Sequence, residues 1–124
     1  MIITGIDIIE IHRISDAVER WGNRFLKRIY TESEISYCRG RIPSLAARFA
    51  AKEGVMKALG TGIRGVSWRD VEIMRERGKA PTIRLHGGAA KIAKDLGVKE
   101  LALSLSHSRH YAVASVVGWS GETS

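Results

Sequence analysis

A helical pattern of apolar positions covers residues 44–62, SLAARFAAKEGVMKALGTG. Ser44 is a candidate N-cap, and Gly60 can end the last turn in the left-handed conformation. Apolar side chains cover almost every face, which is typical of a buried helix. Charged side chains nevertheless occur in it, namely Arg48, Lys52, Glu53 and Lys57. Because a buried charge is costly unless it is paired or binds a ligand, this segment is a candidate functional site.

A structural explanation of these charges is also open. Glu53 and Lys57 are four residues apart, in the order that favours an ion pair on an exposed helix. Long basic side chains can also extend from a half-buried face into solvent. The helix alone therefore does not decide between a site and a structural role.

The first part of the chain predicts a strand followed by short helices. Residues 2–9, IITGIDII, form an apolar run suited to a buried strand. Residues 11–21 have apolar positions three or four apart, which predicts a helix that ends at Gly22. A second short helical stretch follows, and TESE at residues 31–34 predicts the capping box of a third. Residues 39–43 are expected to form a loop.

The second part of the chain alternates between strands and one helix. Its pattern predicts a hairpin of residues 71–73 with 82–85, followed by a short helix over residues 89–96. A second strand pair is predicted over residues 101–106 and 111–117. We therefore expect a single α+β domain over residues 1–118, with a mainly antiparallel sheet packed on a long central helix. Residues 119–124 are expected to form a polar tail.

Composition narrows the range of partners. The chain has 124 residues, a formal net charge of +7 and a pI near 10.0, which indicates an anionic partner. Nucleic acid, phosphorylated small molecules and acidic proteins all qualify. No apolar run approaches the roughly 20 residues of a membrane span, and the first residues lack the basic region of a signal peptide. Cys38 is the only cysteine, which excludes an internal disulfide. A cytoplasmic protein is expected.

Asp7 is the only charge in the first apolar run. A buried carboxylate needs a partner, a proton or a metal, although capping of the following helix is a structural alternative. With Glu53 it would supply two oxygen ligands for Mg²⁺, and Arg48, Lys52 and Lys57 would bind anionic oxygens. Two acids with several bases fit a phosphate-handling site better than a glycosidase.

Other segments offer weaker signals. His107, at a predicted strand end, is a candidate anion ligand or simply a solvated side chain. Gly60 and Gly62 lack the pattern of a P-loop, but their backbone amides can approach a phosphate closely. Residues 20–28, RWGNRFLKR, hold four basic side chains and no acid. With Arg13 they favour an acidic partner over a merely solvated helix face.

Read together, four segments resemble the holo-acyl-carrier-protein synthases of the phosphopantetheinyl transferase superfamily. They are GIDIIEI, RFAAKEGVMKALGTG, VEI and SLSHSRHYAVASV, within a match from about residue 2 to residue 117. The resemblance implies transfer of the phosphopantetheine arm of coenzyme A to a serine of apo acyl carrier protein, with release of adenosine 3',5'-bisphosphate, in support of fatty acid biosynthesis. It also implies Mg²⁺ as cofactor and a homotrimer with active sites between subunits.

The resemblance assigns roles to individual residues. Asp7 and Glu53 match the metal ligands, and Arg48, Lys57 and His107 match the coenzyme A contacts. We add Gly60 and Gly62 to the coenzyme A site because their amides can approach a phosphate. The carrier protein would dock at Arg13, Arg24, Phe25 and Arg28. Asp7, Glu53 and Lys57 are the expected catalytic residues. Glu53 is the candidate base, either directly or through a metal-bound water.

Two other interpretations compete with this one. A basic nucleic-acid-binding module would explain the charge and the cluster from Arg13 to Arg28. It leaves Asp7 and Glu53 unexplained and lacks an aromatic platform for bases, so we expect no nucleic-acid partner. A scaffold protein without catalysis would show no dependence on magnesium.

Overall fold

The computed structural model describes residues 1–62 and 65–120. Its elements, in chain order, are β1 (Ile2–Glu10), α1 (Ile11–Trp21), α2 (Asn23–Ile29), α3 (Glu32–Cys38), α4 (Ile42–Leu59), the 3-10 helix η1 (Trp68–Asp70), β2 (Val71–Met74), β3 (Thr82–Leu85), α5 (Gly87–Leu96), β4 (Val98–His107) and β5 (Tyr111–Ser120). A three-stranded antiparallel sheet has the order β1-β5-β4, and β2 and β3 form a separate antiparallel hairpin. The predicted α+β class is confirmed.

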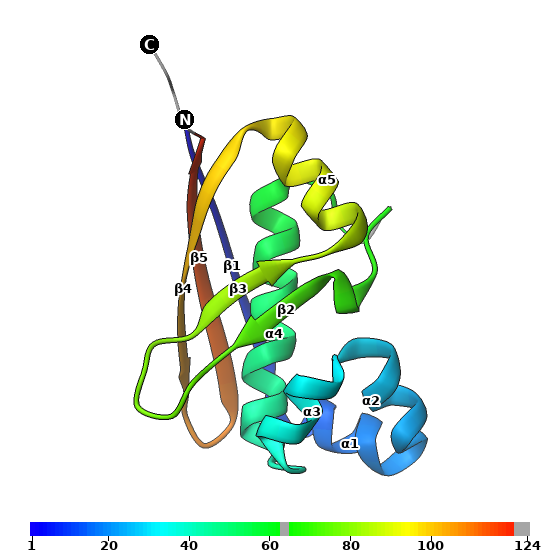
Figure 1. The fold of residues 1–124 in the computed structure, drawn as a ribbon. Helices are drawn as coiled ribbons and strands as arrows, with labels where there is room; N and C mark the ends of the chain where they lie inside the picture. The colour runs from blue at the N-terminus through cyan, green and yellow to red at the C-terminus, as the bar shows by residue number, and fades with distance from the viewer. Residues whose placement is uncertain (63–64, 121–124) are drawn as a thin grey trace.

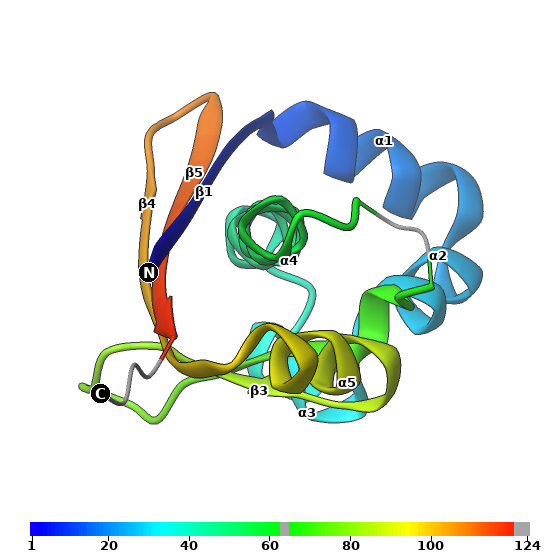
Figure 2. The same ribbon diagram turned by 90° about the horizontal axis from the view of Figure 1, so that it is seen from above.

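Helix α4 lies at the centre of the molecule, as the all-round apolar pattern predicted. Figure 2 looks along this helix and shows the three-stranded sheet on one side, with α1, α2 and α5 around the others. In Figure 1 the β2–β3 hairpin crosses α4, and α3 lies near the start of the helix. None of the helices in the described ranges is long and apolar enough to cross a membrane.

The predicted N-cap of α4 was wrong by three residues. The helix begins at Ile42, and Arg41 rather than Ser44 is the N-cap. Pro43 lies in the first turn, where its missing N–H removes no helical hydrogen bond. The amide of Leu45 donates to the Arg41 carbonyl at 3.1 Å, which places Ser44 inside the helix. Gly60 ends the helix with φ 75°, as predicted.

Two glycines allow β1 to lie directly on α4. A Cβ built on Gly5 would be 2.0 Å from the Gly54 carbonyl oxygen and 2.8 Å from the Ala58 nitrogen, so only a hydrogen fits. A Cβ on Gly54 would lie 3.1 Å from a methyl group of Val116 on β5. This contact fixes the position of the whole strand along the helix.

The remaining boundaries differ only at their ends. The break at Gly22 and the capping box at Thr31 are confirmed. The predicted tail is partly wrong, because β5 continues to Ser120 and Trp119 pairs with Ile2. The rest of that predicted tail, residues 121–124, lies outside the described residues.

Lys52 is buried in an ion pair rather than aimed at a ligand. Its side chain is 0% exposed, and its ammonium group lies 2.8 Å from Oε1 of Glu34. It also donates to the carbonyls of Trp68 and Val71, so every ammonium proton has an acceptor. Oε2 of Glu34 accepts from the amide of Ile73 at 2.8 Å. The structural explanation of the charge therefore holds for Lys52.

A second buried carboxylate joins the hairpin to α3. Glu72 accepts hydrogen bonds from the hydroxyl groups of Thr31 at 2.7 Å and Ser33 at 2.6 Å, and it lies 2.9 Å from Nε2 of His86. Burial alone would raise the pKa of Glu72, but hydrogen bonds from Ser33, Thr31 and His86 outweigh it and lower the pKa to about 2. The ionised carboxylate therefore stabilises the fold.

Glu72→Gln should lower the free energy of unfolding at pH 7 by about 1–3 kcal/mol. The folded pKa lies below the usual 4.5, so this stabilisation is present above about pH 4.5 and is lost as the pH falls towards 2. Urea unfolding of both proteins across this range would measure the difference. Glu76→Gln is the matched control, because that side chain is 76% exposed. A difference that stays constant down to pH 2 would contradict the explanation.

Candidate active site

A cavity of about 480 Å³ lies between β1, α1, α2, α4 and η1. Its walls combine two carboxylates and a guanidinium with apolar and aromatic side chains. The lining residues are Asp7, Ile8, Ile9, Arg13, Ile14, Ala17, Phe25, Phe49, Glu53 and Trp68. The structure thus brings together five residues with predicted roles. Asp7, Glu53, Arg13 and Phe25 line the cavity. Lys57 joins them through its contact with Asp7.

Asp7 and Glu53 come together because of the glycine contact. Asp7 lies two residues after Gly5 on the same face of β1, and Glu53 directly precedes Gly54 on α4. The Asp7 side chain is 12% exposed. Burial raises the pKa of Glu53, and the charge of Asp7 and a hydrogen bond shared with it raise this pKa further. The two carboxyl groups therefore repel each other when both are ionised.

Lys57 partly balances this negative charge. Its ammonium group lies 2.8 Å from Oδ1 of Asp7 and donates to the Ile6 carbonyl at 3.1 Å. The hydrogen bond to Asp7 raises the pKa of Lys57, and the half-exposed side chain can reach a ligand in solvent. Arg13 and Lys57 both act to lower the pKa of Glu53, although burial and Asp7 outweigh them. The site is a carboxylate pair with cations beside it.

The carboxylate pair fits a hard divalent cation. Within residues 1–62 and 65–120, no group of three or more His, Cys, Asp or Glu side chains could hold a metal ion. A tetrahedral zinc site is therefore a poor fit to the described residues. Mg²⁺ requires only one or two protein carboxylates, because waters and phosphate oxygens complete its coordination. Asp7 and Glu53 meet that requirement.

Arg48 lies apart from the carboxylate pair. Its guanidinium carbon is 4.5 Å from the centre of the Tyr37 ring, and Nη1 donates to the Ser44 carbonyl at 3.3 Å. The residue is 3% exposed, and its Nε and Nη2 atoms have no hydrogen-bond partner among the described residues. Buried donors without acceptors are costly, so this guanidinium is suited to an anionic oxygen.

The other predicted coenzyme A residues do not line the cavity. His107 is exposed at the end of β4, on the rung that contains Ala112 of β5 and Ile9 of β1. Gly60 and Gly62 follow the end of α4 with φ values of 75° and 58°. Lys57 and Gly60 share the last turn of α4, where the Gly60 amide donates to the Lys57 carbonyl at 3.0 Å, whereas His107 and Arg48 lie elsewhere in the fold.

Some of the predicted docking residues line the cavity, and the others are exposed on α2. Phe25 packs edge-on against Tyr30, with ring centres 6.1 Å apart, and lines the cavity. Arg24 and Arg28 are exposed on α2. Sequence reasoning missed the stacked pair Phe49 and Trp68, whose ring centres are 4.8 Å apart in the cavity wall. Phe49 belongs to the apolar pattern of residues 44–62, but no sequence pattern indicated that Trp68 would meet it.

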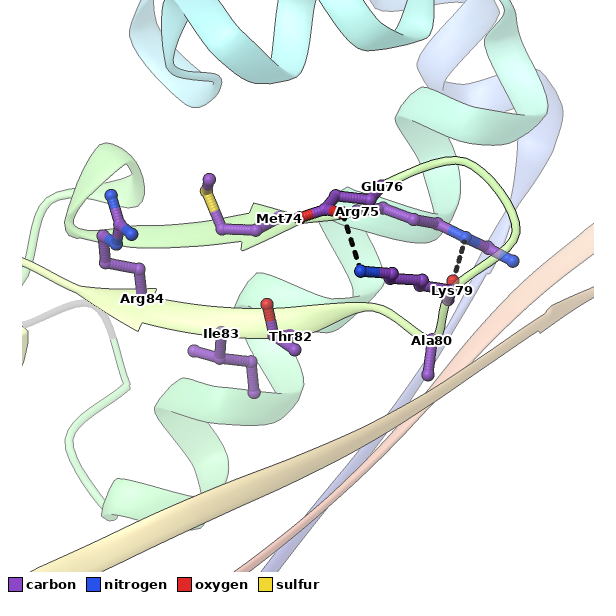
Figure 3. A pocket seen from close by; sticks show the side chains of 8 residues that line it. All are labelled: Met74, Arg75, Glu76, Lys79, Ala80, Thr82, Ile83 and Arg84. Carbon is purple, nitrogen blue, oxygen red and sulfur yellow. Dashed lines mark hydrogen bonds and ion pairs between the residues drawn. The ribbon is translucent and has the colours of Figure 1, made fainter.

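A second groove, of about 320 Å³, lies at the tip of the β2–β3 hairpin. Figure 3 shows its basic side chains, with Arg75 donating to the Lys79 carbonyl and Lys79 paired with Glu76. Neither Asp7 nor Glu53 lines this groove. The carboxylate pair therefore favours the cavity beside α4 as the reaction site.

Comparisons with known proteins identify the family of this chain. Residues 3–116 match the 4'-phosphopantetheinyl transferase superfamily. The chain therefore belongs to this superfamily and, within it, to the holo-[acyl-carrier-protein] synthases.

Sequence relatives of that name cover almost the whole chain. The holo-[acyl-carrier-protein] synthase of Koribacter versatilis is 53% identical, over 92% of this chain and 94% of its own length. That of Herpetosiphon aurantiacus is 48% identical, over 95% and 98%.

Solved structures share the fold. The Helicobacter pylori holo-[acyl-carrier-protein] synthase in complex with coenzyme A has a TM-score of 0.85 and 36% identity, over 94% of this chain and 99% of that one. The Neisseria meningitidis enzyme has a TM-score of 0.87 and 35% identity, over 96% and 99%.

Proposed function

We propose that this protein is a magnesium-dependent holo-[acyl-carrier-protein] synthase. It transfers the phosphopantetheine arm of coenzyme A to a serine of apo acyl carrier protein, releases adenosine 3',5'-bisphosphate and supports fatty acid biosynthesis. The observation that carries the proposal is the half-buried pair of Asp7 and Glu53 with basic side chains beside it. The names of the relatives and the coenzyme A complex of the Helicobacter pylori protein support it.

Asp7 and Glu53 would hold Mg²⁺, which would neutralise the pyrophosphate charge and make the phosphorus more electrophilic. The serine oxygen bonds to the phosphorus of the arm, and the bond from this phosphorus to the bridging oxygen breaks. Lys57 stabilises the negative charge that grows on the leaving phosphate. Glu53, whose raised pKa suits a proton acceptor, takes the serine proton directly or through a water.

Coenzyme A would bind through Lys57, His107, Gly60, Gly62 and Arg48. The two guanidinium nitrogens of Arg48 without partners among the described residues support a phosphate contact there. His107 ends β4 and Gly60 ends α4, and an assembly that places active sites between subunits would bring these two ends together across subunits. Arg13, Arg24, Phe25 and Arg28 would dock the acidic carrier protein.

The outer face of the three-stranded sheet supports a homotrimer. Its strands expose large hydrophobic side chains in one group, namely Ile2, Ile6, Ile8, Tyr111, Val117 and Trp119. A contiguous apolar surface of this kind is typical of an interface between protein chains. We place the enzyme in the cytoplasm, which the single free thiol of Cys38 supports, without a membrane or nucleic-acid partner.

Ile6→Lys should dissociate the assembly, because it puts a charge in the middle of the proposed interface. Ile6 is 62% exposed in the single chain, so the monomer should keep its fold. Sedimentation velocity would measure the mass, with Leu96→Lys on α5 as control. A wild-type protein that sediments as a monomer would contradict the trimer.

Asp7→Asn and Glu53→Gln should each lower the transfer rate by about 100-fold or more, because each removes one carboxylate ligand. Mass spectrometry of apo carrier protein after incubation with coenzyme A and Mg²⁺ would detect the added phosphopantetheine. Mg²⁺ should raise the melting temperature of the wild type but not of the double variant. Near wild-type transfer by Glu53→Gln would refute the metal assignment, and no transfer by the wild type would refute the function.

Lys57→Ala and Arg48→Lys should each weaken coenzyme A binding by about 10-fold and leave carrier-protein binding almost unchanged. Lysine at position 48 keeps the positive charge but lacks the Nε and Nη2 donors of the guanidinium. Isothermal titration calorimetry would measure both affinities, with the exposed Lys91→Ala as control. Equal losses for the two partners would show general damage rather than a nucleotide contact.

A further inference from the structure

The last residue of α1 is an exposed tryptophan. Trp21 is 51% exposed, and the guanidinium of Arg20 lies 5.3 Å from the centre of its ring. Among the described residues, α1 and α2 expose no other large hydrophobic side chain to this degree. Trp21 is also separate from the apolar group on the outer sheet face, which belongs to β1 and β5. Among the described residues of a single chain, packing does not explain why so large an apolar side chain is exposed.

The position of Trp21 connects it to the active site. Arg13, Ala17 and Trp21 are spaced four residues apart, so they follow one another along one face of α1. Arg13 and Ala17 line the cavity that contains Asp7 and Glu53. At 1.5 Å per residue, Trp21 lies about 6 Å beyond Ala17. A macromolecule that covers the mouth of the cavity with the usual area of roughly 800 Å² would therefore also cover Trp21.

The charge around the ring selects an acidic partner. Arg20, Arg24, Lys27 and Arg28 are exposed, and no acidic residue occurs between residues 20 and 31. The acids of α1, Asp16 and Glu19, precede this stretch, and Asp16 lies 3.4 Å from His12. Gly22 has φ 56° and ψ −131°, a conformation that suits glycine, so α2 and its arginines begin directly after Trp21 in the chain.

We propose that Trp21, with Arg20 against its ring, is the apolar anchor that binds the acyl carrier protein. It receives an exposed aliphatic side chain of the carrier, while the surrounding cations pair with carboxylates at the edge of the contact. Tryptophan and arginine in such a setting dominate the affinity of protein interfaces, and edge charges mainly govern association rate. This inference rests on the proposed function, because it identifies how the second substrate is chosen.

Trp21→Ala should raise the Kd and the KM for the carrier protein by about 30-fold. The Kd for coenzyme A and kcat at saturating carrier should not change, because Trp21 does not line the cavity. Trp21→Phe should recover part of the affinity, since a ring remains. Leu96→Ala on α5 is the matched control, because that side chain is 40% exposed and lies on another element.

Biolayer interferometry with an apo carrier protein whose acceptor serine is replaced by alanine measures binding without transfer. Carrier affinity unchanged in Trp21→Ala would overturn the proposal, and so would a selective loss of coenzyme A binding or a change in sedimentation. If the wild type binds this carrier but does not modify the carrier that keeps its serine, the proposed function fails, while the affinity of Trp21→Ala still decides the anchor. If the wild type binds no carrier protein, both fail.

Discussion

The contact between Gly5 and Gly54 is the constraint on which the site depends. A side chain at Gly5 would overlap the backbone of α4, and one at Gly54 would press on Val116. Without side chains between them, strand and helix approach closely enough for Asp7 to meet Glu53. The repulsion between these carboxylates costs stability that packing elsewhere must supply, which is a common feature of active sites. A cation that binds them relieves this repulsion.

The opposite side of α4 is held by charges that are paired inside the protein. Lys52 pairs with Glu34 and bonds to the Trp68 carbonyl, so it fixes both the rotation of the helix and one wall of the cavity. Such a pair contributes little net stability compared with apolar packing, but the loss of one partner is costly. Adjacent residues of α4 thus have different roles, because Lys52 is paired inside the protein and Glu53 lines the cavity.

Much of this organisation was predictable from the sequence. Alternation and helical spacing identified the strands and helices, and the isolated charge of Asp7 indicated that it needs a partner, a proton or a metal. The role of Lys52 was not predictable, because its partners are a glutamate 18 residues away and two backbone carbonyls that only the fold brings near. Periodicity likewise could not show that Arg48 turns towards Tyr37, or that Trp68 stacks on a helix residue, since both depend on long-range packing.

The central claim is that Asp7 and Glu53 hold a divalent cation against the pyrophosphate of coenzyme A. Electron paramagnetic resonance of Mn²⁺ bound to the protein, with ³¹P hyperfine coupling, tests it most directly, because Mn²⁺ accepts the same oxygen ligands as Mg²⁺. The account predicts Mn²⁺ binding that is lost in the Asp7→Asn, Glu53→Gln double variant, with ³¹P coupling that appears only when coenzyme A is added. Unchanged Mn²⁺ binding in the double variant, or no ³¹P coupling in the wild type, would contradict it.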